Sequence, residues 1–382
     1  MRKFYTLFAF VTILAALLAA CKPQTTPAPL VPQPSSAPVS VSNPNLPSPI
    51  AEDAAWAKVV AAARKEGKVN AYSYSWLGDT GLAISRAFKE KYGISVEITT
   101  GRGAEFAERF KTEKRMGQQV ADITEGGTVA INAMKPEGVL TSVADDLPVL
   151  KEKGVWLVDP TAMDTQDKAN LTWRLLVYNP YINTKLVKTE EVPQSWRDLL
   201  LPRWKGKMSF GEPNVGATVY SVMVVLMDNK VWDEDYIRAL YRQELHFVVS
   251  PADELLKLAR GENDIIVVVA DSEASRFALE GAPIRAIDMK DGVVLSTAAV
   301  AAIAKGPNPN AARVFLNWIF SREGQTLAGE RMGSKMVRKD VPDIRPQAVQ
   351  TSMNNPFVLS VDNMGKASQL FRDKWFNKLV GR

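Results

Sequence analysis

Short apolar segments alternate with longer segments of helical periodicity from residue 51 onward. Residues 68–75, 94–99 and 120–124 have the pattern of strands, and residues 78–93 and 104–116 have that of helices. Short strands that alternate with helices of ten or more residues are typical of a largely parallel sheet with helices on both faces. The sequence therefore predicts an α/β fold. A length of 382 residues is more than one hydrophobic core usually fills, which favours two lobes.

A second series of strands and helices follows the first. Residues 171–178, 265–270 and 295–303 are apolar and strand-like, while residues 309–321 and 371–379 are predicted helices. Ligands of such sheets bind at the carboxyl ends of the strands. The turns that lead from a strand into a helix are therefore where we expect functional residues.

Three consecutive turns of the first series carry glycine or a hydroxyl residue where a helix is predicted to begin. They are residues 74–78, 99–103 and 125–128. The free backbone N–H groups and the dipole of a helix N-terminus favour an anion. Glycine is also ordinary turn chemistry, so the three turns at one sheet edge indicate a ligand site more strongly than any one of them does.

The first 50 residues differ in composition from the rest. Two basic residues precede an uncharged, mostly apolar stretch of 17 residues, and Cys21 follows two alanines. This is the pattern of a secretory signal peptide at residues 1–20, and it resembles the lipobox of bacterial lipoproteins, which implies a lipid on the sulfur of Cys21. The stretch is short for an uncleaved membrane span of about 20 residues. Residues 21–50 then form the lipidated cysteine and a proline-rich linker.

The composition excludes several kinds of chemistry. One histidine, His246, and one cysteine cannot build a Cys/His zinc site or a disulfide framework. A Ser-His-Asp hydrolase would have to use His246. The formal charge of +5 is small for 382 residues and includes no long run of like charges, so nucleic acid is not an expected partner.

Several short segments of the chain occur in an order and at spacings that are typical of one protein family. They are residues 121–123, 178–179, 193–200 with 204–207, 211–213 with 216–217, 307–312 and 321–325. In order and spacing they resemble the extracellular solute-binding proteins of ABC importers, in the branch that includes ferric-ion-binding proteins. The resemblance runs over most of residues 51–330.

The resemblance implies a two-lobed periplasmic-binding-protein fold of type II, with mixed, mostly parallel sheets and a hinge of two crossover segments near residues 175–180 and 295–302. The implied boundaries are a first lobe at 51–175 and 295–335, a second lobe at 176–294, and C-terminal helices at 336–382 whose lobe is left open. The function implied is that of a monomeric receptor without cofactor or catalysis. It would capture a small solute between closing lobes and deliver it to an ABC permease, outside the cytoplasm and anchored to the cell membrane by its lipid.

The positions that depart from the ferric members bear on the ligand. Those members typically use two adjacent tyrosines after the strand that matches residues 265–270, where this chain has Asp271-Ser272-Glu273. The anion-holding helix start of the family is kept at residues 216–218. We therefore expect a small anionic solute of the carboxylate, phosphate or phosphonate type. The expected ligand-binding residues are Ser75, Trp76, Arg102, Gly103, Gly127, Thr128, Gly216, Ala217, Thr218, Asp271 and Ser272.

Each of the more specific assignments has a structural alternative. Arg102 can grip an anion with two parallel hydrogen bonds or lie solvated at a helix start. Trp76 can form a wall of the cleft or pack inside a lobe. Thr218 and Ser272 can bind the ligand or cap a helix. Asp271 can bind a ligand ammonium group or act as a cap.

Three other functions remain open at this point. Ferric iron could be held by a non-standard set that includes Tyr74, Glu125 or Asp271, because Fe³⁺ favours phenolate and carboxylate oxygens. An extracytoplasmic hydrolase would have to work with carboxylates alone, since the chain has no GxSxG or HExxH motif. A ligand sensor that docks on a membrane kinase would have the same fold and site as a transport receptor.

Arg102→Ala tests the anion assignment. If the guanidinium of Arg102 pairs with the anion, the substitution weakens binding of the solute at least tenfold in a titration of the purified protein. An unchanged affinity would contradict the assignment.

Overall fold

Twelve strands within the described part of the chain form one sheet that runs through the whole fold. The computed structural model describes residues 54–101, 103–213, 217–353 and 355–382. Cys21, the predicted signal peptide and the linker lie outside the described residues. The strands are β1 (Lys68–Ser73), β2 (Ser95–Thr100), β3 (Ile123–Gly127), β4 (Leu140–Thr141), β5 (Leu171–Asn183), β6 (Met208–Gly211), β7 (His246–Val248), β8 (Ile265–Ala270), β9 (Ile284–Ala286), β10 (Val293–Ile303), β11 (Lys335–Met336) and β12 (Pro356–Val358).

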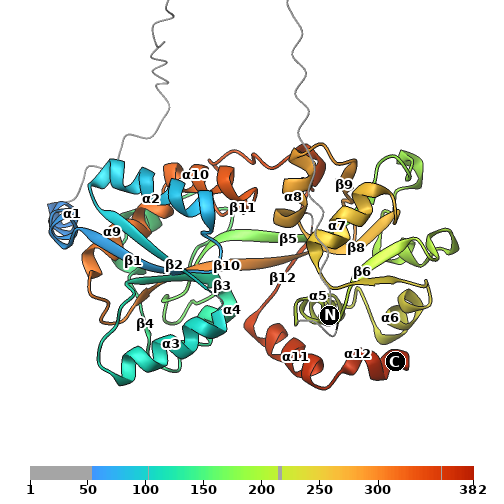
Figure 1. Cartoon of the computed structure of the whole chain (residues 1–382), viewed down its shortest axis with the longest axis horizontal. Helices are drawn as coiled ribbons and strands as arrows, with labels where there is room; N and C mark the ends of the chain where they lie inside the picture. Colours follow the sequence, from blue (N-terminus) through green and yellow to red (C-terminus); the bar gives the residue numbers. More distant parts are fainter. Residues whose placement is uncertain (1–53, 102, 214–216, 354) are drawn as a thin grey trace, which may run out of the picture. The chain divides into compact units, whose positions relative to one another are not determined.

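Helices connect most of these strands (Figure 1). The α-helices are α1 (Ala54–Glu66), α2 (Gly78–Tyr92), α3 (Gly103–Arg115), α4 (Thr128–Asn132), α5 (Ala217–Asp228), α6 (Glu234–Tyr241), α7 (Pro251–Arg260), α8 (Asp271–Leu279), α9 (Pro309–Ile319), α10 (Arg322–Met332), α11 (Val361–Arg372) and α12 (Trp375–Val380). Short 3₁₀ helices lie at Ala144–Asp146, Pro148–Lys151, Thr189–Glu191, Trp196–Leu200, Pro202–Trp204 and Gln347–Val349. Within the described ranges no helix combines the length and the apolar character that a membrane span requires.

The sheet has parallel strands toward each end and antiparallel pairs in the middle. Eight strands follow one another in the order β2-β1-β3-β10-β5-β8-β6-β7, and the other four pair at its middle, β9 and β11 with β5 and β4 and β12 with β10. Strand β1 is parallel to β2 and β3, and β6 is parallel to β7 and β8, whereas β10 and β5 are antiparallel to each other and to their outer neighbours. The α/β class with mixed sheet pairing is therefore confirmed.

Strands β5 and β10 belong to two separate hydrophobic cores. Leu171, Trp173 and Leu175 of β5 pack in a first core, with Phe88 and Phe315, while Val177 and Ile182 pack in a second one. Strand β10 does the same, since residues 298–302 contribute to the first core and residues 293–295 to the second. We call the elements around these cores the first and the second lobe. Figure 1 shows β5 and β10 running side by side from one to the other.

Local sequence explains where several helices end. Gly67 and Gly93 follow α1 and α2 with φ of 74°, a left-handed conformation that favours glycine and ends a helix. Ser321 caps the start of α10 by accepting a hydrogen bond from the Gly324 N–H at 3.2 Å.

The predicted core positions Trp196 and Trp204 are confirmed, since their side chains are 0% and 3% exposed.

Two predicted elements differ from the structure. The strand expected at 120–124 lies at Ile123–Gly127, because Glu125, Gly126 and Gly127 pair with Val300, Ala299 and Ala298 of β10. The expected turn at 125–128 is therefore mostly strand. The helix expected at 371–379 is two helices, α11 and α12, separated at Lys374, whose φ of 50° is incompatible with a continuous helix.

The C-terminal helices pack on the second lobe. Helix α11 lies against α5 and α12 against α6. Ala367, Phe376 and Leu379 are buried in the second core. The lobe of these helices, which the sequence left open, is thus the second one.

A pair of helical glycines provides a stability test. A Cβ at Gly324 would lie 2.2 Å from the Trp318 carbonyl oxygen, whereas at Gly365, in α11, nothing lies within 4 Å. Gly324→Ala should lower the free energy of unfolding by about 1–3 kcal/mol, because backbone must move. Gly365→Ala should raise it by about 0.5–1 kcal/mol through helix propensity. Urea unfolding of both variants checks this, and equal effects would contradict the close packing at Gly324.

Candidate functional site

A cavity of about 700 Å³ opens where the parallel strands end. Tyr74 and Ser75 follow β1, Gly127 ends β3, and Gly211 ends β6. The ends of β7 and β8 line it too, so that both lobes contribute. The cavity thus lies at the strand ends where the βα pattern placed the functional residues.

The turn after β1 is held in place by Glu125. The Ser75 N–H and Oγ donate hydrogen bonds to the Glu125 carboxylate at 3.0 and 2.7 Å, and Ser73 Oγ donates one at 2.7 Å. Glu125 is 2% exposed and does not line the cavity. It is therefore a positioning residue for the turn, and the structure contradicts its assignment as an iron ligand.

Trp76 packs inside the first lobe, which contradicts its assignment to the cavity wall. Its side chain is 1% exposed, and its ring lies 5.8 Å from that of Trp173 and 5.4 Å from that of Phe315. The neighbours Tyr74, Ser75 and Leu77 line the cavity instead. The alternative of lobe packing was thus the right one.

Gly127 lines the cavity, whereas Thr128 does not. The Thr128 hydroxyl donates a hydrogen bond to the Thr297 carbonyl oxygen at 2.9 Å and lies 2.5 Å from the Thr297 hydroxyl. Thr128 begins α4, which has only five residues and whose N-terminus is no anion seat. The structure therefore gives the Thr128 hydroxyl a partner within the protein and does not support its assignment as a ligand-binding residue, while that of Gly127 stays a prediction.

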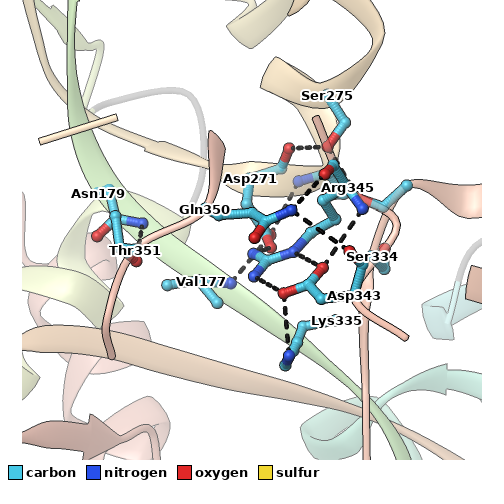
Figure 2. A network of polar contacts seen from close by, with 12 residues as sticks. Val177, Asn179, Asp271, Ser275, Ser334, Lys335, Asp343, Arg345, Gln350 and Thr351 are labelled. Carbon is cyan, nitrogen blue, oxygen red and sulfur yellow. Dashed lines mark hydrogen bonds and ion pairs between the residues drawn. The ribbon is translucent and has the colours of Figure 1, made fainter. Parts of the chain in front are cut away.

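Asp271 is fully buried and paired, which contradicts its assignment to a ligand ammonium group or to iron. Its Oδ2 accepts a hydrogen bond from Arg345 Nη1 at 2.5 Å, and its Oδ1 accepts one from the Val177 N–H at 3.0 Å. Asp343 accepts two hydrogen bonds from the same guanidinium, from Nε to its Oδ1 at 2.8 Å and from Nη2 to its Oδ2 at 2.7 Å (Figure 2). The network joins β5, the start of α8 and the segment after β11, and it lies behind the cavity wall.

The N-termini of α2 and α8 are open to the cavity. Ala270 and Ser272 line it at the start of α8, and Leu77 and Thr80 line it at the start of α2. Neither N-cap residue makes a side-chain capping hydrogen bond, but at the start of α8 the Ser272 N–H donates a hydrogen bond to Asp271 Oδ1 at 2.8 Å. The ligand role of Ser272 remains a prediction. Arg102 and Gly216 lie outside the described residues, as do the side chains of Gly103, Ala217 and Thr218, which belong to α3 and α5.

Arg174 is a cavity residue that the sequence analysis missed. It lies on β5, is 6% exposed and lines the cavity. Its Nη1 donates a hydrogen bond to Ser334 Oγ at 3.2 Å, and its Nε has no partner among the described residues. An arginine inside the otherwise apolar segment 171–178 was the available signal, because a charge on a strand buried on both faces is rare.

Tyr178, Glu212, Glu254 and Glu273 were also missed as cavity residues. Burial raises the pKa of the Tyr178 phenol to about 12, so it remains a hydrogen-bond donor at neutral pH. His246, by contrast, is exposed on β7, and its Nδ1 lies 2.5 Å from Asn263 Oδ1, away from the cavity lining.

Asp343 makes the network behind the cavity sensitive to acid. Burial opposes ionisation, but the hydrogen bonds and charges of Arg345 and Lys335 prevail and lower the pKa of Asp343 from 3.8 to about 2. A lowered carboxyl pKa contributes stability above about pH 4, worth roughly 2 kcal/mol, which is lost as the pH falls toward 2. Asp343→Asn should therefore be less stable at pH 7 and lose less stability between pH 5 and pH 3 in urea unfolding. Asp362→Asn, at an exposed carboxylate, is the control and should have the same dependence of unfolding free energy on pH as the unmodified protein. If Asp343→Asn also has that same dependence, the prediction is contradicted.

Comparisons with known proteins agree with this architecture. A protein of Salmonella typhimurium, provisionally named a 2-aminoethylphosphonate-binding periplasmic protein, is 26% identical over 265 residues, which is 67% of this chain and 73% of that protein. The structure of Trichodesmium IdiA (FutA) with iron and citrate has a TM-score of 0.67 at 20% identity and covers 82% of this chain and 99% of its own. AfuA of Actinobacillus pleuropneumoniae with fructose-6-phosphate has a TM-score of 0.60 at 16% identity, and the match covers 82% of this chain and 98% of AfuA.

These solved structures confirm the periplasmic-binding-protein fold. The model of the bacterial extracellular solute-binding protein family matches residues 69–333, well over half of the chain. This protein therefore belongs to that family of extracellular solute-binding proteins.

Proposed function

We propose that this protein is the receptor of an ABC importer and that it binds a small anionic solute, of the carboxylate, phosphate or phosphonate type, in the cavity. The observation that carries the anionic class is Arg174, a buried guanidinium at the cavity that forms no ion pair with a carboxylate of the described residues. A buried charge without a counter-charge costs several kcal/mol in free energy. A bound anion would supply that counter-charge.

Other donors at the cavity support an anion. The α2 N-terminus offers backbone N–H groups, and its helix dipole favours negative charge there, whereas at the start of α8 the Ser272 N–H already donates a hydrogen bond to Asp271. The neutral phenol of Tyr178 and the hydroxyls of Ser75 and Ser272 are further donors. The predicted partner Arg102 follows β2 in sequence and would add a second cation if it reaches the cavity.

Closure of the two lobes over the cavity would bring these hydrogen-bond donors together. Ser75 and Gly127 lie on the first lobe, whereas Ser272 lies on the second, and β5 and β10 connect the two cores. Rotation of one lobe against the other at these strands is the hinge motion typical of periplasmic binding proteins. The closed form would then be recognised by the permease.

The relatives point to more than one kind of ligand. The Salmonella protein is named for a phosphonate, and AfuA was solved with a sugar phosphate, so both names support a phosphorus-containing anion here. IdiA was solved with iron and citrate. Iron is not favoured here, because Glu125 and Asp271 are occupied by protein partners, so that Tyr74 is the one member of the predicted iron set that lines the cavity. In addition, no group of three His, Cys, Asp or Glu among the described residues could hold a metal.

The remaining parts of the proposal rest on the sequence. The predicted lipid on Cys21 and the proline-rich linker would tether a monomeric receptor to the outer side of the cell membrane. The solute-binding family supports a role in binding rather than in catalysis. A sensor role would use the same cavity, and it is distinguished by whether solute uptake fails when the protein is removed.

Arg174→Met tests the proposal through two opposite effects. If Arg174 is kept for an anion, the variant should lose at least tenfold in affinity for the solute that copurifies with the protein. It should at the same time be more stable without ligand, by about 1 kcal/mol or more, because an uncompensated buried charge is removed. Calorimetric titration and urea unfolding measure the two effects.

The control is Arg276→Met, at an exposed arginine of α8 that lies over the Phe277 ring and does not line the cavity. This variant should keep its affinity. Loss of stability together with unchanged affinity in Arg174→Met would show that Arg174 serves the fold and not the ligand.

A further inference from the structure

A buried carboxyl group lines the same cavity as Arg174. Glu254 lies in the first turn of α7, is 2% exposed, and its Oε1 has no hydrogen-bond partner among the described residues. Apolar side chains, among them Val219, Val222 and Val248, line the same cavity. A buried carboxyl oxygen without a hydrogen-bond partner costs free energy that local packing does not repay. The residue therefore calls for a functional explanation.

Glu254 differs from the other carboxylates near the cavity. Glu212 forms an ion pair with Arg382, at 3.3 Å between Oε2 and Nη2, and Asp271 forms one with Arg345. Glu273 is exposed to solvent. Glu254 has no ion pair within the described part of the chain and is shielded from water. It is thus placed to receive a cation from the ligand.

We propose that Glu254 binds a protonated amino group of the solute, so that the ligand is a zwitterion whose anionic group lies at Arg174. The inference rests on the proposed function, because Arg174 has to hold the anionic end. It narrows the ligand to small molecules with an amine and an anion at different ends, such as aminoalkyl phosphonates, aminoalkyl phosphates or amino acids. A cavity of about 700 Å³ has room for both groups and the chain between them.

Binding of an ammonium group should release a proton from Glu254. Burial raises the pKa of Glu254 to about 8, against a smaller opposing effect of the nearby Ser209 hydroxyl. At pH 7 the carboxyl of the free protein is therefore mostly neutral, and it has to ionise to pair with an ammonium group. No charged neighbour contributes to this shift. The charged and titratable groups of α7 and of the elements packed against it are Asp253, Lys257 and Arg260 on α7, Asp271, Glu273 and Arg276 on α8, His246 on β7, and Arg174, Tyr178 and Tyr181 on β5.

Matched pairs of probes test the inference by calorimetric titration at pH 7. The pairs are 2-aminoethylphosphonate with ethylphosphonate, phosphoethanolamine with ethyl phosphate, and 3-aminopropionate with propionate. In at least one pair the amino member should bind at least tenfold more tightly than its partner. Binding of the amino member should also release about one proton from the protein, as expected for a carboxyl of pKa about 8. The number of protons is obtained by comparing the binding enthalpies in two buffers of different ionisation enthalpy.

Two variants assign the effect to a residue. Glu254→Gln keeps the neutral form of the side chain and should fold normally, but it should bind both members of a pair within about twofold of each other and release no proton. Glu273→Gln, at an exposed carboxylate of the same cavity, should keep the preference and the proton release. A preference that disappears in Glu273→Gln and persists in Glu254→Gln would overturn the assignment.

The outcomes separate this inference from the proposed function. If probes bind in an Arg174-dependent way without preference for the amino member and without proton release, the zwitterion is wrong and the anion receptor stands. Affinity that falls for both members as pH rises from 7 to 9 would mean that neutral Glu254 donates a hydrogen bond to the anion, which also overturns the inference. If none of the six probes binds and Arg174→Met leaves binding of the copurified solute unchanged, both proposals fail.

Discussion

The antiparallel pairing of β5 with β10 is the constraint on which the rest of the structure depends. Each strand begins in one hydrophobic core and ends in the other, so this pair joins the parallel parts of the sheet in the two lobes. The same strand β5 carries Arg174 and Tyr178 to the cavity, and its Val177 N–H holds Asp271. The groups that we propose to bind the solute and the hinge about which the lobes would rotate are therefore parts of one element.

The buried charges of the protein fall into two kinds. Arg345 lies between Asp271 and Asp343 with its hydrogen bonds made by the protein itself, which stabilises the start of α8 at the cavity edge. Arg174 and Glu254 are as deeply buried, but each keeps an atom without a partner among described residues. A satisfied network stabilises a fold, whereas a buried ionisable group with an unpaired atom at a cavity is a candidate for binding a ligand, whether it is charged like Arg174 or mostly neutral like Glu254 in the free protein. This contrast is the basis on which we propose a ligand-binding role for Arg174 and Glu254 and a structural one for Arg345.

Periodicity was enough to predict the α/β class and several elements, because the strand and helix patterns of β1 to α3, β8 and α9 are local, whereas the type II fold and its hinge were implied by the family resemblance. The end of β3 was missed since Gly126 and Gly127 look like a turn until β10 pairs with them. Trp76 and Asp271 were misassigned for a similar reason: Trp173, Phe315 and Arg345, which enclose them, are distant in sequence. Arg174 had a local signal in its apolar strand, whereas Glu254 lies in an ordinary helix start and had none.

The most direct measurement of the central claim is a crystal structure of the protein with the solute that copurifies with it. We predict an organic anion in the cavity whose oxygens accept hydrogen bonds from the guanidinium of Arg174. A solute whose anionic group lies away from Arg174, or a metal ion held in the cavity without an anion at that guanidinium, would contradict the account.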